Sequence, residues 1–468
     1  MERRTSNQDG LAISPGSQAV ALFAYSLASF FPAFMSSAVN IALPSINQEF
    51  HADAVVLSWL VTSFVLALAV LSLPFGRIAD ILGIKKIFIL GIIIFILASA
   101  AASFSNTIIM LILCRAAQSI GSAMIIGNSI ALVTALYPAN RRGRALGINL
   151  ACVFIGMSLG PFLGGVLTQH LGWRSIFLIN IPAGLLAIAL ILWKVKGEWS
   201  ESRGEKFDIA GSIIYGLSLV ALIYGFTLLP DLPGAVLIGA AVLGLFAFIR
   251  WENRTPSPIL NLGLFRQNRT FVFSNLAGLI CSSGSYALIF LLSLYLQYVK
   301  GLTAEQAGFI MVAQPAVQAL LSPFVGRLSE KIEPRIVASA GMALTLLGMM
   351  AFIFISEDTS LAQIIIALIV VGTGLALFVS PNVNLIMSSV TPKYYAVASA
   401  VAGTLGGVGR ALSMGIATVV IALVLGRVII SPEYHTTFLT STRITFAILS
   451  GLSLAGVVAS YYGGRARR

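Results

Sequence analysis

Two arginines are the side chains whose positions most favour chemistry, because each lies inside a long apolar segment. Arg115 begins the run LCRAAQSIGSAMIIGNSIALVTALYP, which is longer than the ~20 residues that a helix needs to cross a bilayer. A cation at mid-membrane costs about 2.5–3.5 kcal/mol and normally faces a bundle interior or a wet cavity. We therefore expect Arg115 to be functional; the alternative is that its head reaches an interface. Arg410, in GGVGRALSMG, is the second embedded cation, and its glycine-rich surroundings also suit helix packing.

Amide side chains also occur inside the apolar segments, at Asn40, Gln118, Asn128, Gln314, Gln318, Asn382 and Asn384. An unsatisfied polar group in lipid costs several kcal/mol, so these amides should face a cavity or a neighbouring helix. Each of them can contact a substrate or form a hydrogen bond between helices.

No carboxylate accompanies these groups near the middle of a predicted span. The 17 acidic residues fall in loops or near span ends, and His51, His170 and His435 lie at the outer ends. We therefore expect no side chain that titrates easily near neutral pH at the membrane centre. Two embedded arginines without embedded acids favour a neutral or anionic substrate, or one recognised by shape and aromatic contact.

The sequence offers no signature of an enzyme. It has no metal-ligand cluster, no nucleophile–base pairing and no GxxxxGK[ST] phosphate loop, so we expect no catalytic site, cofactor or metal. Cys114, Cys152 and Cys281 fall inside predicted spans and are expected to be small buried hydrophobes. The formal charge of +12 comes from short basic clusters and not from a continuous basic face, so we expect no nucleic-acid partner.

The composition is that of a membrane protein with many spans. Of 468 residues, 58% are hydrophobic and 10% charged, and the mean hydropathy is +0.95, which excludes an ordinary soluble domain. Residues 1–17 are polar, and we expect no cleavable signal. With fourteen spans and a cytoplasmic N-terminus, the Lys and Arg outside the spans obey the positive-inside rule, except Arg174, Lys300, Arg427 and Arg443.

A proline- and glycine-rich motif carries a resemblance to a known family. GMSLGPFLGG is similar to the fifth-helix motif of antiporters in the major facilitator superfamily, and its matching residues are Gly156, Gly160, Pro161, Gly164 and Gly165. RAAQSIGSA, around Arg115 and Gln118, resembles the fourth-helix motif of the same superfamily. GWRSIFLINIP resembles the turn into helix six of its fourteen-helix drug-exporter branch, the drug:proton antiporters.

The loop motif between helices two and three is also present, with departures. GRIADILGIKK matches the superfamily pattern at Gly76, Asp80, Gly83 and Lys85. Ile81 stands where the pattern has an arginine, so we expect part of the charge network to be missing. A second departure is Met35, which stands where related drug antiporters commonly carry an aspartate.

The second half of the chain repeats the first. SPFVGRLSEKI, around Gly326, aligns with LPFGRIADIL, around Gly76, at an offset of 250. We therefore expect an all-α polytopic membrane protein with two pseudo-symmetric six-helix bundles, two extra helices and cytoplasmic termini. The expected parts are an N-terminus (1–17), a first bundle (18–197), a linker with the extra helices (198–252), a cytoplasmic linker (253–268), a second bundle (269–463) and a basic tail (464–468).

The resemblance implies a secondary active transporter of the cell membrane that works by alternating access. We expect a monomer that exports a small hydrophobic or amphipathic compound, as in multidrug resistance. The branch also implies proton coupling, for which the sequence offers no central carboxylate. Two alternatives stay open: transport of a small anionic metabolite through Arg115 or Arg410, and a non-transporting membrane receptor or assembly subunit. Substrate, direction and coupling ion do not follow from the sequence.

Overall fold

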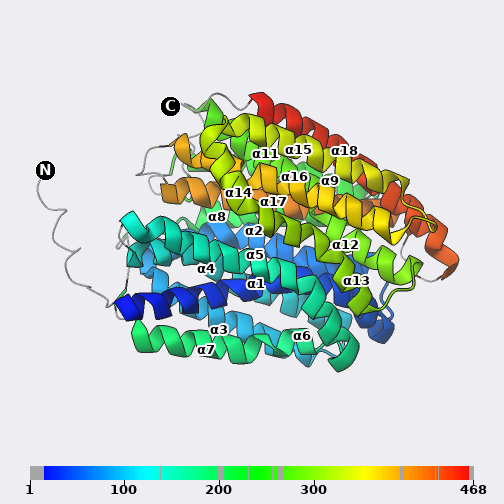
Figure 1. The fold of residues 1–468 in the computed structure, drawn as a ribbon, viewed down its shortest axis with the longest axis horizontal. Helices are drawn as coiled ribbons and strands as arrows, with labels where there is room; N and C mark the ends of the chain where they lie inside the picture. Colours follow the sequence, from blue (N-terminus) through cyan, green and yellow to red (C-terminus); the bar gives the residue numbers. More distant parts are fainter. Residues whose placement is uncertain are drawn as a thin grey trace, which may run out of the picture.

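A computed structural model shows a chain that is almost entirely helical (Figure 1). The described residues are 15–137, 139–195, 197–198, 205–229, 231–255, 258–260, 268–390, 395–426, 428–430 and 432–462, and they include no β-strand. The predictions made for most of the N-terminus (1–17), for most of the linker (253–268), for Arg427 and for the tail (464–468) lie outside these residues.

The helices fall into two halves and a separate pair. The first half contains α1 (Pro15–Phe50), α2 (Ala54–Leu82), α3 (Ile84–Ser103), α4 (Ile108–Leu136), α5 (Ala139–Leu171), α6 (Ser175–Leu178) and α7 (Asn180–Lys194). The pair is α8 (Ile209–Thr227) and α9 (Leu232–Glu252). The second half contains α11 (Arg269–Ser285), α12 (Ala287–Leu294), α13 (Ala304–Met311), α14 (Ala313–Lys331), α15 (Pro334–Ala351), α16 (Leu361–Ser388), α17 (Tyr395–Val420) and α18 (His435–Tyr462). Short 3-10 or π segments flank four of these: η1 (Tyr295–Val299), η2 (Phe352–Phe354), η4 (Ile421–Leu425) and η5 (Pro432–Tyr434).

Thirteen helical segments of the described chain are long and apolar enough to cross a membrane. This confirms a polytopic all-α protein. The predicted span around Gln314 is interrupted at Val312, which separates α13 from α14, and neither piece qualifies by itself. The count of fourteen spans therefore stays a prediction.

Local sequence sets several helix ends. The Asp53 side chain caps α2 by accepting a hydrogen bond from the Val56 N–H at 2.8 Å. Thr303 and Gln306 form a capping box at the start of α13. Gly83, between α2 and α3, has φ of 115°, a value that residues with a side chain rarely adopt. Such ends let consecutive helices reverse direction within a few residues.

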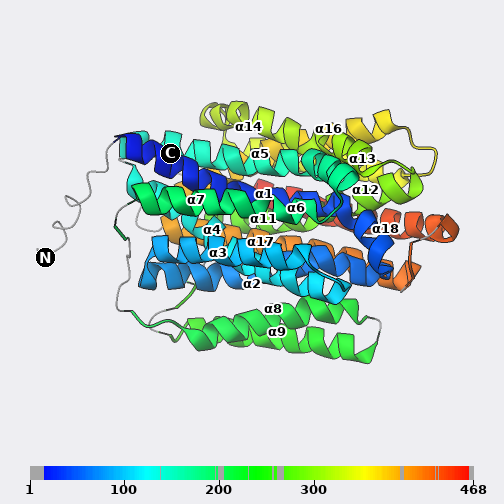
Figure 2. The ribbon, with the colours of Figure 1, turned by 90° about the horizontal axis from the view of Figure 1, so that it is seen from below.

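The two halves meet along two groups of helices. Within the halves, α1 packs on α5, α3 on α4, α15 on α16 and α11 on α17; between the halves, α2 packs on α17, and α5 on α13 and α14. Figure 2 shows α8 and α9 as a separate layer beside α2. The Tyr215 hydroxyl of α8 donates to the Ala69 carbonyl of α2 at 3.0 Å.

The helix bundle has two ends, which differ in the parts of the chain that lie there. α1 begins and α18 ends at the same end (Figure 1), which we call the terminal end. The opposite end, where Phe50 and Ala54 lie, is the distal end.

Candidate functional site

Arg115 on α4 is 1% exposed, and its hydrogen-bond partners among the described residues all lie in the first half. Its Nε donates to the Leu60 carbonyl on α2 at 3.2 Å, and its Nη1 donates to Gln118 Oε1. Its guanidinium carbon lies 4.2 Å from the centre of the Phe64 ring, a cation–π distance. No carboxylate among the described residues forms an ion pair with it. A carbonyl, an amide and an aromatic ring therefore compensate the buried charge.

A second layer of hydrogen bonds fixes these partners. Gln118 Nε2 donates to Ser99 Oγ on α3 at 2.7 Å, and Ser119 Oγ donates to the Phe64 carbonyl at 2.6 Å. Because the amide nitrogen of Gln118 is engaged by α3, its oxygen is directed at Arg115. The guanidinium group thus links α2, α3 and α4, which is a structural role.

Arg410 on α17 is in a different situation. It is half-buried, and its side chain makes no hydrogen bond or ion pair with another described residue. It lies fifteen residues from each end of the combined α17–η4 segment (395–425), whereas Arg115 lies only seven residues, about 10 Å, from the start of α4. Arg410 is therefore the more central cation and the one whose donors are available.

Tyr286 lies near both arginines. It lies at the break between α11 and α12, close enough to Arg115 and to Arg410 to interact electrostatically with both. A phenol near two cations can donate a hydrogen bond to an anionic or other accepting group. Sequence patterns single out neither Tyr286 nor Phe64, because nothing in the sequence distinguishes one tyrosine among 12 or one phenylalanine among 28.

The amide side chains predicted in the first half donate hydrogen bonds to other groups of that half. Asn40 Nδ2 donates to the Ser36 carbonyl at 2.9 Å, and Asn128 Nδ2 donates to the Met124 carbonyl at 2.8 Å. These are bonds to the preceding helical turn. The Asn40 Oδ1 atom is buried and has no hydrogen-bond partner in the described part of the chain. With Gln118 bound to Arg115, this half uses most of its embedded amide donors for its own structure.

The amide side chains predicted in the second half do not donate such hydrogen bonds to described residues. Gln314 and Gln318 on α14 are each 7% exposed, and Asn382 on α16 is 5% exposed. None of these three side chains makes a hydrogen bond to a described residue. Asn384, two residues further along α16, is exposed. Because an unmade hydrogen bond of a buried amide is costly, the three buried amides are suited to bind water or a ligand.

The glycine motif of α5 allows close packing on α1. Gly156, Gly160 and Gly164 all face that helix. A Cβ on Gly160 would lie 1.9 Å from Ser37 Oγ, which itself donates to the Met157 carbonyl at 3.2 Å. Side chains larger than hydrogen are therefore excluded at Gly160, and the backbones of α1 and α5 approach closely.

The same motif also contacts the other half. A Cβ on Gly165 would lie 2.4 Å from the Ala304 carbonyl oxygen of α13, and a Cβ on Gly308 would lie 2.1 Å from the Pro161 carbonyl oxygen. Helix α5 thus packs on its own half through one face and on the second half through another.

The loop motif holds the segment that comes after α7. The Lys85 N–H donates to Glu198 Oε1 at 2.8 Å, and Lys85 Nζ donates to the Val195 carbonyl at 2.6 Å. A Cβ on Gly83 would lie 2.6 Å from the Glu198 carboxyl carbon. Gly76 and Asp80 lie on the last turns of α2. The motif therefore fastens the terminal end of the first half.

The distal ends of the two halves are joined by hydrogen bonds. Asn47 Nδ2 donates to the Tyr298 hydroxyl at 3.0 Å, Gln297 Nε2 donates to the Ile41 carbonyl at 3.0 Å, and the Ala54 N–H donates to the Val428 carbonyl at 3.0 Å. His170 on α5 lies 3.1 Å from Glu305 on α13. The bonds between described residues of the two halves all lie in this distal part, so the halves are closed there.

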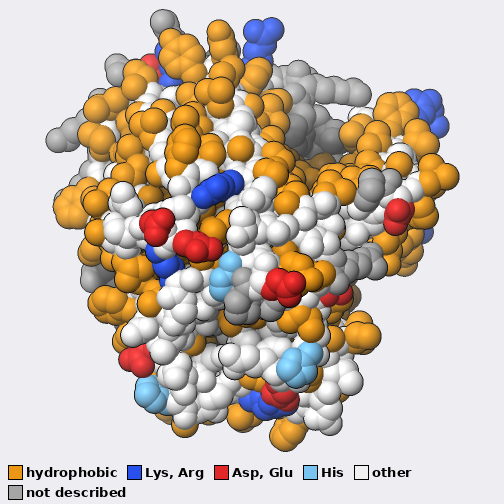
Figure 3. All heavy atoms as spheres, turned by 90° about the vertical axis from the view of Figure 1, so that its right-hand side faces the viewer, with side chains coloured by type: hydrophobic (Ala, Val, Ile, Leu, Met, Phe, Trp, Pro, Cys, Tyr) orange, Lys and Arg blue, Asp and Glu red, His pale blue; other side chains and the backbone are white. Residues whose placement is uncertain are grey.

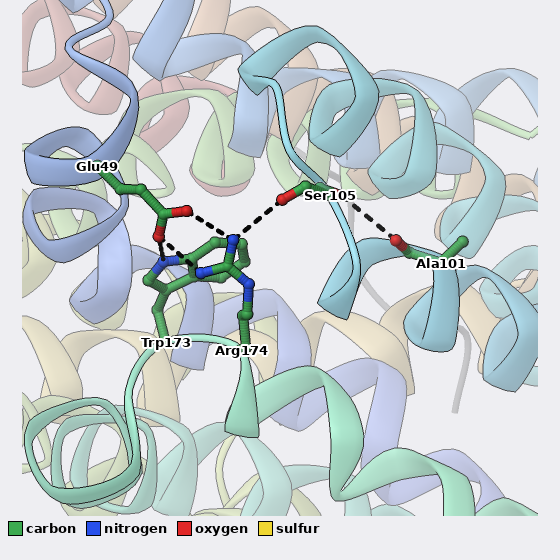
Figure 4. A network of polar contacts seen from close by, with 5 residues as sticks. All are labelled: Glu49, Ala101, Ser105, Trp173 and Arg174. Carbon is green, nitrogen blue, oxygen red and sulfur yellow. Dashed lines mark hydrogen bonds and ion pairs between the residues drawn. The ribbon is translucent and has the colours of Figure 1, made fainter.

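The distal surface carries acidic and histidine side chains inside a hydrophobic rim (Figure 3). One network there ties the first half together (Figure 4). Glu49 accepts from Trp173 Nε1 at 2.9 Å and from both Nη atoms of Arg174 at 2.6 Å. Arg174 also donates to the Ser105 carbonyl at 3.1 Å. The bonds to Glu49 hold the pKa of Arg174 above its usual value. This network is structural, because its donors and acceptors satisfy one another.

Comparison with known proteins identifies the family. The profile described as Major Facilitator Superfamily matches residues 25–414, and matches again at residues 274–467. The chain belongs to the major facilitator superfamily. Its members are transporters, and homologues of this chain are named as drug-resistance exporters.

Two similar proteins illustrate the range of names. The riboflavin transporter RibZ of Clostridioides difficile (strain 630) is 30% identical over 364 residues, which cover 78% of this chain and 79% of that protein. The multidrug resistance protein Stp of Mycobacterium tuberculosis (strain ATCC 25618 / H37Rv) is 31% identical over 413 residues, which cover 86% of this chain and 76% of that protein.

Solved structures show the same fold at low identity. A bacterial homologue of the human lysosomal transporter Spinster, described as inward-facing and unoccupied, superposes with a TM-score of 0.67 at 18% identity, covering 96% of this chain and 97% of that chain. A peptide transporter in complex with sulfate superposes with a TM-score of 0.68 at 13% identity, covering 93% of each chain.

Proposed function

We propose that this member of the superfamily is a secondary active exporter of a small amphipathic compound that is uncharged or anionic. The observation that carries the proposal is Arg410, a central cation without a hydrogen bond among the described residues. The buried amides of Gln314, Gln318 and Asn382 add further unused donors. A cationic compound would meet two guanidinium groups and no compensating carboxylate among the described central residues.

The orientation belongs to the same proposal. We take α13 and α14 together as a fourteenth span and the terminal end as cytoplasmic, supported by the distribution of Lys and Arg. The distal hydrogen bonds then close the outer side, and the central groups are loaded from the cytoplasm, as export requires. The protein would act as a monomer in the cell membrane and exchange substrate for protons, which the resemblance to drug:proton antiporters supports.

Transport by the purified protein tests the proposal. Proteoliposomes would be loaded with one of three fluorescent amphipathic dyes, cationic, uncharged or anionic, and a proton gradient would be applied. We expect the uncharged or anionic dye to move and the gradient to accelerate it. Movement of the cationic dye alone would contradict the substrate class. Saturable dye binding without movement would favour the receptor alternative.

Alternating access has its own test on α5. Gly165→Leu places a side chain against the Ala304 carbonyl of the other half, so the distal ends can no longer close. We expect a folded protein with transport reduced at least about 100-fold, because one of the two required conformations is lost. Gly147→Leu on the same helix is the matched control, since a Cβ there meets nothing within 4 Å. Equal transport by both variants would show that closure at Gly165 is not needed.

A further inference from the structure

A pair of acidic side chains lies at the terminal end of α8 and α9, apart from the central groups. Asp208 immediately precedes α8 and Glu252 ends α9, and they are only 9% and 4% exposed. A Cβ on Gly211 would lie 2.4 Å from Asp208 Oδ2 and 2.8 Å from Glu252 Oε1. The two oxygens therefore border the same small space.

The two carboxyl groups differ in their hydrogen bonds. Asp208 accepts from the Gly211 N–H at 2.9 Å, and its two oxygens accept from Trp251 Nε1 at 3.1 and 2.9 Å. Glu252 accepts through Oε2 from the Leu260 N–H at 2.9 Å, whereas its Oε1 is buried without a hydrogen-bond partner among the described residues. The surroundings of Asp208 thus suit a carboxylate, and those of Glu252 leave one oxygen unsatisfied.

Helix position separates the two groups further. Asp208 is the N-cap of α8, where the helix dipole stabilises an anion. Glu252 lies in the last turn of α9, where the same effect destabilises an anion. Burial also disfavours the charged form of Glu252. A second negative charge close to Asp208 would be shielded from water and would repel the first.

No cation among the described residues compensates Glu252. Lys206, before α8, and Arg250 and Arg254, near the end of α9, are exposed and form no ion pair with it. Arg77, on the neighbouring α2, pairs with Glu205 at 2.5 Å. On α17, which also packs against α8, the embedded cation is Arg410, in the middle of that span.

We propose that Asp208 and Glu252 form a proton-binding site in which Glu252 is the protonated member and directs its Oε1–H to the Asp208 carboxylate. One proton then supplies the missing partner of Oε1 and removes the repulsion between two buried anions. The ligand of this site is a proton, and the site lies outside the substrate region. It does not depend on which compound is transported.

The site also holds the linker between the two halves. The Leu260 N–H binds Glu252, and the Leu260 side chain packs against a small cluster of the second half formed by Phe271, Ile386, Ala398 and Val401. Loss of the proton would place two negative charges side by side and weaken the position of the Glu252 carboxyl group.

Infrared spectroscopy of the purified full-length protein tests the site directly, because a protonated carboxyl group has its own C=O stretching band. At neutral pH we expect a band that Glu252→Gln removes and that the control variant Glu205→Gln, at an exposed acid, keeps. In Asp208→Asn the band should disappear at a lower pH than in the wild type, since the repelling charge is gone. A wild-type spectrum without this band, or a band that survives in Glu252→Gln, overturns the proposal.

Thermal unfolding gives a second readout. A buried acid that is protonated only in the folded state stabilises the protein at low pH, and this contribution is lost as the pH rises through the titration of the folded state. The melting temperature of the wild type should therefore fall relative to that of Glu252→Gln as the pH rises above about 4.3, the ordinary pKa of a glutamate. If the melting temperatures of the wild type and of Glu252→Gln change in parallel with pH, the proposal is overturned. Stoichiometric binding of Mn²⁺ that Glu252→Gln abolishes would make the pair a metal site and also overturn it.

Discussion

The two halves of this transporter share a fold but treat their embedded polar groups differently. In the first half, the Arg115 guanidinium is bonded to Leu60 and Gln118, and both of these lie in that half. In the second half, Arg410 and Gln318 make no side-chain hydrogen bond to a described residue. The repeat in the sequence predicts similar scaffolds, so the difference arises from the side chains and not from the architecture.

This difference suggests a division of roles. A cation whose donors are used by its own helices stabilises those helices, whereas a cation with unused donors can bind a ligand. We therefore propose that substrate is held mainly by the second half and that Arg115 positions α2, α3 and α4. The sequence alone favours the opposite order, because the glycines around Arg410 also suit helix packing.

The largest effect is expected at Arg410. Arg410→Ala should reduce substrate binding and transport by about 100-fold, the equivalent of one lost charge-assisted hydrogen bond of about 3 kcal/mol, while the melting temperature stays unchanged. Arg410→Lys should retain part of the activity, because a point charge replaces the planar fork. Dye binding and proteoliposome transport measure this. Normal transport by a folded Arg410→Ala variant would show that Arg410 does not bind the substrate.

Arg115→Ala should lower the stability of the protein more than it lowers transport. The Leu60 carbonyl and the Gln118 amide oxygen lose their donor, which should lower the free energy of unfolding by about 2–3 kcal/mol. Transport per folded molecule should fall much less than in Arg410→Ala. The measurements are thermal unfolding in detergent and transport normalised to folded protein. A variant of normal stability that fails to bind substrate would reverse the comparison between the halves.

A matched pair of charge insertions sharpens the comparison. Gln318→Glu adds a negative charge to the second half, at a side chain that no described cation contacts through a hydrogen bond. The affinity for an anionic substrate should fall about 10-fold, or about 1.4 kcal/mol. Gln118→Glu puts the same charge beside Arg115, which neutralises it, and should leave binding nearly unchanged. Competition with the anionic dye measures both. Equal losses would show that the two halves contribute alike.

The smallest effect is expected at Tyr286. Tyr286→Phe removes one hydroxyl group and keeps the ring, so binding should weaken by about three- to ten-fold, corresponding to about 1 kcal/mol, without a change in stability. Isothermal calorimetry with the identified substrate measures this. A larger loss than in Arg410→Ala would make the phenol, and not the guanidinium, the main contact.

The sequence alone determined the class of the protein and much of its helical plan. Apolar runs are local, so the long spans and the superfamily motifs could be predicted without knowledge of contacts. The glycines of GMSLGPFLGG predicted close helix packing for the same reason, since a missing side chain is visible in the sequence. The interruption at Val312 was not predicted, although its cause is visible in the sequence: Pro315 has no N–H to donate to the Met311 carbonyl one turn earlier.

Which polar groups are satisfied depends on contacts between helices that are distant in the sequence. Whether Arg115 has partners depends on Leu60 and Ser99, and these reach it, directly or through Gln118, from other helices. Whether Glu252 has a second partner depends on Asp208, which lies 44 positions earlier in the chain. A residue's type determines which hydrogen bonds it can make, but the packing of distant segments determines which of them are made, and that decides where this protein has donors left for a ligand.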